Sequence, residues 1–205
     1  MKITAAPILI DENHVARAEA EALIAQVYAH EFGAKITTFA KLLIALQDEN
    51  GTIVAAAGLR MAGDFFSEVY LDRPIENVLS DHWQPPATRD EIAEVTTLAA
   101  RRPNASHALF SAIIGFMRSQ DIRFAFFTVT ERLHHMLKRT GIPAEELARA
   151  TPDRIDNADD WGHYYATSPR VVAIHDAFVS MAATAVSGVE GAVEAQNQNH
   201  SQMAG

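Results

Sequence analysis

Hydrophobic and polar positions in the first third of the chain predict a strand, a helix and a hairpin. Residues Ile3–Ile10 alternate loosely between apolar and other side chains, as a half-buried strand does. Over His14–Phe32, apolar residues recur one helical turn apart, and Gly33 is suited to end that helix. The segment KLLIALQDENGTIVAAAGLR, residues 41–60, places two apolar strands around Asn50-Gly51, a pair that favours a type I′ turn.

A further apolar stretch, FFSEVYL at Phe65–Leu71, predicts another strand. Its alternation places Phe66, Glu68 and Tyr70 on one face and the residues between them on the other. A polar connection that contains prolines follows from residue 72 to residue 89.

The second half of the chain alternates between strand and helix patterns. The predicted elements are a strand at Ile92–Ala99, a helix at Ser106–Gln120, a strand at Phe124–Val129, a helix at Glu131–Thr140 and a strand at Arg170–Ile174. Two strands separated by a helix of that length indicate a parallel βαβ unit inside an otherwise antiparallel sheet. We therefore expect an α/β (α+β) fold, with a central mixed, mostly antiparallel sheet flanked by helices.

Composition limits the domain organisation and the partners. The chain has 205 residues, of which 48% are hydrophobic, which suits one domain with a substantial core. We assign residues 1–178 to this domain and 179–205 to a C-terminal tail, helical or disordered, because the tail is small and polar from about Ser187. The formal net charge of −9 repels phosphates, so we expect no nucleic-acid partner.

The same sequence features limit the compartment and the chemistry. No apolar run is long enough to span a bilayer, so we expect no stable membrane insertion. The first residues, MKITAAPILIDENH, lack the long apolar region of a signal peptide, which predicts a cytoplasmic protein. There is no cysteine, which excludes a cysteine nucleophile and zinc–thiolate sites.

The motif RRPNAS, residues 101–106, lies between a predicted strand and a predicted helix. The N-terminus of a helix favours phosphate, and the guanidinium groups of Arg101 and Arg102 would add charge-assisted hydrogen bonds. Asn104 can adopt a left-handed conformation, Ala105 allows close approach to the backbone and Ser106 can cap the helix. These residues suit a pyrophosphate cradle. The alternative is an ordinary capped loop with solvated arginines.

The same motif resembles the pyrophosphate-binding loop of the Gcn5-related N-acetyltransferases, Arg/Gln-x-x-Gly-x-Gly/Ala, between their fourth strand and third helix. Arg101-x-x-Asn104-x-Ser106 matches it, with Asn and Ser at the glycine or alanine positions. The predicted order of strands and helices also fits. The resemblance implies an acyl-CoA N-acyltransferase-like fold, an acyl-CoA or acyl-phosphopantetheine donor, and no metal.

A narrower resemblance covers about residues 20 to 175. The blocks AAAGLRMA, FFSEVYLDRPIE, EIAEVTTLAA, FAFFTVTERLHHMLKRTGI, LARATPDRI and WGHYYATSPRVVA look like the thermostable hemolysin family at similar spacing. That family commonly has Gly-Asn where this chain has Thr96-Thr97. The strand order and the acidic strand residues also resemble acyl-homoserine lactone synthases, which use acyl-carrier-protein donors.

Acyl transfer from a thioester to an amine needs a base, donors that polarise the carbonyl, and an acid for the leaving thiolate. Glu94 shares a strand face with Thr96 and is our candidate base, acting directly or through water. The alternative for Glu94 is an ion pair with Arg60 or Arg89.

Glu68 offers a second carboxylate, with Tyr70 beside it on the same face. The two carboxylates could equally bind the ammonium group of the substrate. Tyr164 or Tyr165 is the candidate acid for the leaving thiolate. The helix that begins at Glu131 contains no tyrosine that could take this role instead. For at least one of these two tyrosines, the alternative is a packed aromatic corner.

The resemblance implies that backbone N–H groups around Leu98 to Ala100 contact the thioester and the pantetheine arm. Arg60 could clamp a carboxylate or a phosphate, with a salt bridge to a nearby glutamate as the competing interpretation. His134 and His135 point about 100° apart on a helix, so we expect surface or supporting positions and no metal site.

We therefore expect an acyltransferase that moves an acyl group from an acyl-CoA or acyl-carrier-protein thioester to a small amine, by direct transfer because the chain has no cysteine. An acyl carrier protein is the expected macromolecular partner, and Phe- and Ile-rich faces are compatible with a homodimer. The alternatives are a membrane-active hemolysin-like protein, motivated by the family name alone, and a non-catalytic module that binds the donor.

Overall fold

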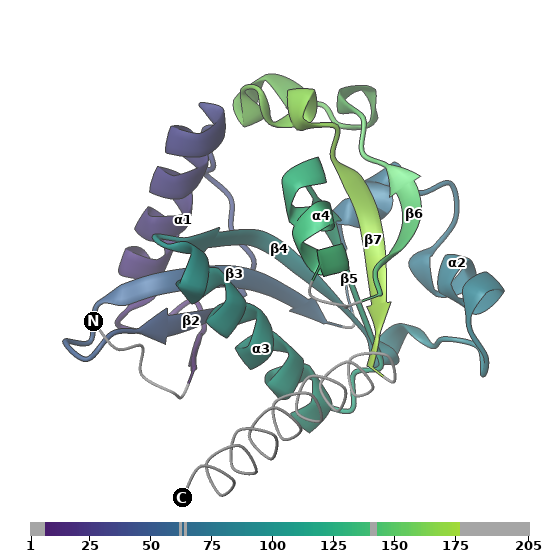
Figure 1. Ribbon diagram of the computed structural model, residues 1–205, viewed down its shortest axis with the longest axis horizontal. Helices are drawn as coiled ribbons and strands as arrows, with labels where there is room; N and C mark the ends of the chain where they lie inside the picture. Colours follow the sequence, from purple (N-terminus) through teal and green to yellow (C-terminus); the bar gives the residue numbers. More distant parts are fainter. Residues whose placement is uncertain (1–6, 62, 64, 140–142, 177–205) are drawn as a thin grey trace, which may run out of the picture.

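The computed structural model describes residues 7–61, 63, 65–139 and 143–176 (Figure 1). Its helices and strands are β1 (Ile8–Ile10), α1 (Arg17–Phe32), β2 (Leu42–Gln47), β3 (Ile53–Met61), α2 (Ile75–His82), β4 (Ile92–Ala100), α3 (Pro103–Ser119), β5 (Phe124–Val129), α4 (Glu131–Arg139), β6 (Glu145–Arg149) and β7 (Arg170–His175). The strands form one sheet in the order β1-β2-β3-β4-β5-β7-β6. The tail predicted over residues 179–205 lies outside the described residues.

Among the described strands, every neighbouring pair is antiparallel except β4 and β5, which run parallel. Helix α3 connects them, so the predicted βαβ unit and the mostly antiparallel mixed sheet are confirmed. The pairing of β4 with β5 covers only Ile92–Glu94 opposite Phe124–Phe126. Beyond this point the two strands part, β4 staying with β3 and β5 staying with β7, and a split opens within the sheet (Figure 1).

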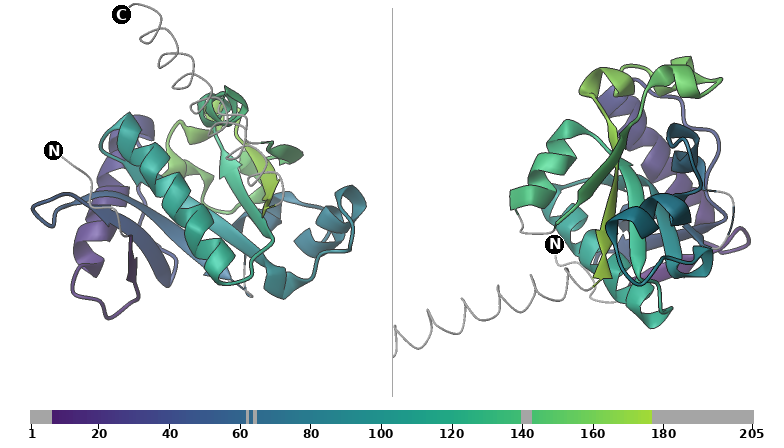
Figure 2. Two further views of the ribbon diagram at one scale, coloured as in Figure 1. Left: turned by 60° about the horizontal axis from the view of Figure 1, so that its bottom comes forward. Right: turned by 90° about the vertical axis from the view of Figure 1, so that its right-hand side faces the viewer.

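Helices cover both faces of the sheet. Helix α1 packs on β3 and β4, and its Leu23 belongs to a buried cluster with Leu43 of β2. Helix α3 packs on β2, β3 and β4, and its Leu109 belongs to a cluster with Ile44. Leu43 and Ile44 are adjacent strand residues and point to opposite faces, so α1 and α3 lie on opposite sides of the sheet (Figure 2).

The predicted first helix and the predicted hairpin are both present, although the turn differs. Helix α1 ends at Gly33, which is left-handed with φ 67°. In the β2–β3 turn only Gly51 has positive φ, so the type I′ prediction is wrong. The Asp48 side chain accepts hydrogen bonds from the N–H groups of Asn50 and Thr52, and these bonds favour a longer turn over residues 48–52.

The strand predicted at Phe65–Leu71 is wrong, because this segment forms a 3-10 helix at Phe66–Tyr70. The buried carboxylate of Glu94 accepts the N–H groups of Phe66 and Ser67, so a side chain takes the place of a neighbouring strand as their partner. Helix α2 and strand β6 were not predicted from the sequence.

Helix α3 begins one turn earlier than predicted, with Arg102 as its N-cap residue and Pro103 in its first turn. A proline suits this position because its missing N–H group is not needed there. Asn104 is therefore helical and Ser106 lies inside the helix, so the predicted left-handed Asn104 and the predicted serine cap are both wrong.

Strand β4 contains a bulge at Thr97, which has φ 46°. The register with β3 shifts across the bulge, from Gly58 opposite Thr96 to Ala56 opposite Ala99. Glycine suits position 58, because a Cβ atom there would overlap the Thr96 hydroxyl oxygen. The bulge turns the second half of β4 at the place where the sheet splits.

Candidate active site

A cavity of about 290 Å³ lies at the split, and four of the residues predicted for substrate binding or catalysis line it. They are Arg60, Tyr70, Thr96 and Tyr164. The wall also includes residues of the segment after α1, such as Lys35, and Trp161, whose ring stacks on that of Phe66 with centroids 5.7 Å apart.

A second, apolar cavity of about 110 Å³ lies between the diverging strands and α4. Val95 and Leu98 of β4, Phe127 of β5 and Leu133 of α4 line it. It shares Tyr28, Thr97, Thr128 and Tyr164 with the first cavity. The two cavities therefore meet where β4 and β5 part. Leu98, predicted to contact the donor, lies in this apolar cavity.

Glu94 lies beneath the first cavity and does not line it, since its side chain is 0% exposed. Its two carboxylate oxygens each accept one backbone N–H, from Phe66 and Ser67, at 2.6 Å. Arg60 Nε is 3.8 Å from Glu94 Oε2, so the alternative ion pair with Arg60 is present. Burial raises the pKa of Glu94, and the hydrogen bonds to Ser67 and Phe66 and the charge of Arg60 oppose the rise.

The other predicted carboxylate, Glu68, lies outside the cavity. Arg89 donates to both of its oxygens, at 2.8 and 2.7 Å, and the N–H of Ile75 donates to one of them at the start of α2. The hydrogen bond from Arg89 is the main reason that the pKa of Glu68 is lowered. Glu68 therefore anchors α2 and does not face the cavity.

The two predicted tyrosines occupy different environments. Tyr164 is buried, lines both cavities, and packs in an aromatic cluster with Tyr28, Phe32 and Trp161. Burial raises the pKa of Tyr164 well above its ordinary value, which keeps its phenol protonated. Tyr165 instead shares a hydrogen bond of 2.6 Å with Tyr70 through their hydroxyl oxygens.

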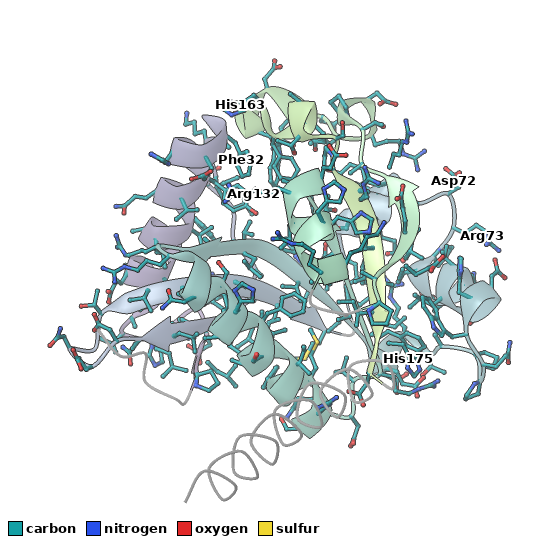
Figure 3. All side chains as sticks on the ribbon, in the orientation of Figure 1. Phe32, Asp72, Arg73, Arg132, His163 and His175 are labelled. Carbon is teal, nitrogen blue, oxygen red and sulfur yellow. The ribbon has the colours of Figure 1, made fainter. Side chains whose placement is uncertain are left out.

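The aromatic cluster connects two segments that are far apart in the sequence. The N–H of His163 donates to the carbonyl of Phe32 at 2.9 Å, and their rings meet edge to face (Figure 3). Gly162 lies so close to Phe32 that a Cβ atom would overlap the Phe32 carbonyl oxygen. This contact keeps Tyr164 beside the two cavities at the split. Tyr164 therefore belongs to the predicted aromatic corner and also lines the cavities, so the two alternatives for this residue do not exclude each other.

A third cavity, of about 260 Å³, lies at the start of α3, and four predicted cradle residues line it. They are Arg101, Arg102, Asn104 and Ala105; Ser106 is not among its lining residues. Both arginines are exposed, although Arg101 Nε also approaches the carbonyl of Ile53 at 3.5 Å. Asp48 forms part of the same cavity wall. Ala100 pairs with Ala55 of β3 just before the cradle and does not line it.

The two histidines of α4 lie in different environments. His134 is 3% exposed, and burial is the main reason that its pKa is lowered, whereas His135 is exposed. Within the described residues, no group of three or more histidine or acidic side chains could hold a metal ion.

Two cavity residues that bond to each other were not predicted from the sequence. Thr128 Oγ1 donates to Ser67 Oγ at 2.9 Å, and both residues line the first cavity. Ser67 was missed because its segment was taken for a strand with this residue on the opposite face from Tyr70. Thr128 was missed because an isolated threonine in an apolar strand carries no distinguishing signal.

The fold is shared with several solved structures. The chain is similar to FeeM, an N-acyl amino acid synthase from uncultured soil microbes, with a TM-score of 0.58, 13% identity, and 85% of this chain and 91% of that chain covered. It is similar to the AHL synthase LasI, with a TM-score of 0.57, 12% identity, and 83% and 90% covered. A putative N-acetyltransferase from Lactobacillus plantarum gives a TM-score of 0.51, 13% identity, and 82% and 96% covered.

These TM-scores show a fold shared with acyl-homoserine lactone synthase and N-acetyltransferase structures. No curated protein matches the sequence. The sequence model described as thermostable hemolysin matches residues 10–178. This match includes the split between β4 and β5, the cradle and the aromatic cluster, and it shows that the chain belongs to the thermostable hemolysin family.

Proposed function

We propose that this protein is an acyltransferase that moves an acyl group from an acyl-CoA or acyl-carrier-protein thioester to a small amine, in the domain of residues 1–178 and in the cytoplasm. The observation that carries the proposal is the meeting of two cavities at the split of the sheet, next to a buried carboxylate. One is lined mainly by apolar side chains. The other, called the polar cavity from here on, also has charged and hydroxyl side chains such as Arg60 and Ser67 in its wall. A thioester placed at the junction would have its acyl chain on one side and the amine on the other.

Each part of the donor has a proposed place. The cradle around Arg101 and Arg102 would bind its phosphate, and β4 beyond Thr97 offers backbone N–H groups to its pantetheine arm. The acyl chain would enter the apolar cavity next to Leu133. Arg60, which lines the polar cavity, would bind an anionic group of the acceptor.

The reaction needs two proton transfers. The nitrogen of the amine forms a bond to the thioester carbonyl carbon, and the carbon–sulfur bond breaks. The proton lost by the nitrogen goes to Glu94, and Tyr164 donates its phenol proton to the leaving thiolate. The proton on Glu94 then returns through solvent to Tyr164. Because no part of the Glu94 side chain is exposed, its proton must arrive through another group.

A thiol-release assay tests the proposal without background, because the protein has no cysteine. Purified protein is mixed with acyl-CoAs of graded chain length, or with acyl carrier proteins, and with a panel of small amines. We expect thiol release that depends on the amine. If none of the donors gives thiol release and none binds in a thermal-shift assay, the protein is not an acyltransferase. Donor binding without thiol release would indicate a non-catalytic module.

The cradle is tested by reversing its charge. The double substitution Arg101→Glu and Arg102→Glu should raise the KM for the donor by at least 10-fold and change kcat little, because the bonds it removes hold bound donor and transition state alike. Arg118→Glu reverses one charge at the opposite end of α3, where it also breaks the ion pair with Asp176, and serves as the control. Equal donor KM values in the double variant and the control would refute the cradle.

A further inference from the structure

Two hydroxyl-bearing residues, Ser67 and Thr128, lie between the buried Glu94 and the polar cavity. Ser67 is held beside Glu94 by its own backbone, because its N–H donates to Glu94 Oε1 at 2.6 Å. Ser67 Oγ in turn accepts a hydrogen bond from Thr128 Oγ1 at 2.9 Å. Ser67 and Thr128 line the cavity and Glu94 does not, so these hydroxyls lie between the carboxylate and any bound acceptor.

The position of the two hydroxyls follows from the fold. Glu94 and Phe126 are the last paired residues of β4 and β5, and Thr128 is two residues further along β5. Residues two apart on a strand share a face, so the Thr128 side chain lies on the side of Phe126, where the strands begin to separate. The 3-10 helix at Phe66–Tyr70 brings Ser67 down onto the carboxylate at this same point.

We infer that Ser67 and Thr128 form a proton relay that carries a proton from the acceptor amine in the polar cavity to the carboxylate of Glu94. The inference rests on the proposed acyltransfer and deepens it, because it assigns the step that a buried base cannot perform by contact. Ser67, which would touch the amine or Thr128, becomes a catalytic residue, and Glu94 becomes the proton store beneath it.

The proton count of the relay is balanced. The amine nitrogen gives a proton to a hydroxyl oxygen of the relay, and Ser67 passes its own hydroxyl proton to Glu94. Each hydroxyl ends with one proton, as it began, and the carboxylate becomes a carboxylic acid. The hydrogen-bond geometry agrees with this order, since Thr128 donates to Ser67 Oγ and the backbone N–H of Ser67 holds this residue against Glu94 Oε1. Ser67 is also among the groups that lower the pKa of that carboxyl.

The competing role for Glu94 is purely structural. Its carboxylate could serve only to anchor the 3-10 helix through the N–H groups of Phe66 and Ser67. The two roles make different demands on Ser67, because the anchor uses its backbone N–H and the relay uses its hydroxyl. Ser67→Ala removes the hydroxyl and keeps the N–H, so it separates the roles.

The experiment measures kcat and KM against pH for Ser67→Ala and Thr128→Val, with Ser111→Ala as a control that removes a hydroxyl from the exposed side of α3. A relay predicts a loss in kcat of about 100-fold at neutral pH for Ser67→Ala, with both KM values within about 3-fold. The loss should shrink as the pH rises, because hydroxide in solvent can then accept the proton that the nitrogen loses when the amide bond forms. Thr128→Val should show the same trend to a smaller degree.

Other outcomes overturn the relay. An unchanged kcat in Ser67→Ala, or a loss that is equal at every pH, would leave only the anchor. If Ser67→Ala does not fold, Thr128→Val gives the same decision from the second hydroxyl.

A second readout separates the relay from the proposed function. Carbon-13 NMR of labelled glutamate follows the titration of Glu94 without turnover, and Ser67→Ala should raise its pKa because a hydrogen bond to the charged form is lost. Wild-type protein that turns over no donor defeats the proposed function. An unchanged Glu94 titration in Ser67→Ala defeats the relay.

Discussion

At the scale of single residues, the most constrained position of the site is Thr97. Its φ of 46° is an uncommon conformation for a β-branched residue, and among the described residues its buried hydroxyl oxygen has no hydrogen-bond partner. It lies where the polar and apolar cavities join. Strain and an unsatisfied hydroxyl at the junction fit a position selected for binding a reacting group, and neither contributes to stability.

The bulge also depends on Gly58. The loss of stability caused by a substitution at Gly58 should be recovered by a second substitution at Thr96. Gly58→Ala should lower the free energy of unfolding by about 2 kcal/mol, because its Cβ atom overlaps the Thr96 hydroxyl. Adding Thr96→Ala to Gly58→Ala should recover most of the loss. Urea denaturation of the two single variants and the double variant measures this; additive losses would show that the overlap is not the cause.

At this scale the sequence predicted some partners and could not predict others. Pairing of Glu94 with Arg60 was one of two alternatives, and strand register decides it, since the two residues are directly opposite each other. Tyr164 and Tyr165 could not be separated, because adjacent residues carry the same local signal. The environment of Glu68 depends on Arg89, 21 positions away along the chain, and on an unpredicted helix.

At the scale of elements, the closed end of the split is held by an ion pair between the starts of β4 and β5. Arg123 Nη1 donates to both oxygens of Glu91, at 2.9 and 3.0 Å, and the Arg123 N–H donates to the Glu91 carbonyl. Both side chains are about three-quarters buried. The pair fixes one end of the two strands while their other ends diverge.

This ion pair should make stability depend on pH. Arg123 is the main cause that lowers the pKa of Glu91 to about 2, from an ordinary value of 4.5. A lowered folded-state pKa stabilises the protein above pH 4.5, and the stabilisation is lost as pH falls towards 2. Glu91→Gln should therefore cost about 1–2 kcal/mol at pH 7 and progressively less below pH 4.5.

Urea unfolding at several pH values measures the effect, with the exposed neighbour Asp90→Asn as the control. A Glu91→Gln difference that stays constant from pH 7 to pH 2.5 would contradict the assignment.

The apolar cavity next to α4 should set the length of the acyl chain. Leu133→Trp fills this cavity, so we expect kcat/KM for an octanoyl donor to fall at least 10-fold more than for an acetyl donor. Leu133→Met conserves volume and should change the ratio little. The ratio of the two rates is the measurement, and equal losses for both donors would place the acyl chain elsewhere.

At the level of elements, the sequence predicted those with a strong local pattern. Strand β5 was predicted with its observed bounds, and α1 and β7 were predicted within a few residues. The strand predicted at Phe65–Leu71 was wrong. The same apolar pattern also fits a 3-10 helix whose first N–H groups donate to the buried carboxylate of Glu94, and the pattern alone does not separate the two. Helix α2 was missed because the whole segment from residue 72 to residue 89 was taken as a polar connection, although Ile75, Val78 and Leu79 have the spacing of one helix face.

At the scale of the whole molecule, the family name raises the question of membrane lysis. Within the part of the chain that the structure describes, no helix is both long and apolar enough to cross a bilayer. The net charge of −9 also opposes binding to anionic lipid. The sequence predicted the overall architecture because the order of strands and helices allows few topologies, whereas the splitting of the sheet depends on long-range packing.

Liposome leakage tests the lytic alternative directly. We expect purified protein, without an acyl donor, to release no more dye from anionic vesicles than an unrelated acidic protein of similar size does. Dye release that rises with protein concentration would support a membrane-active function, and protein heated beyond its unfolding transition controls for lysis by unfolded chains.

The split between β4 and β5 has a consequence for how this family can change over evolutionary time. The cavities at the split arise because two backbones diverge, and they do not require small side chains in the core. The residues that line them past Glu94 carry little of the β4–β5 pairing. Substitution of half-buried lining residues such as Leu98 and Leu133 can alter which molecules fit while the seam at Ile92–Glu94 keeps the two strands paired. Buried lining residues such as Phe127 also belong to the core and are less free to change.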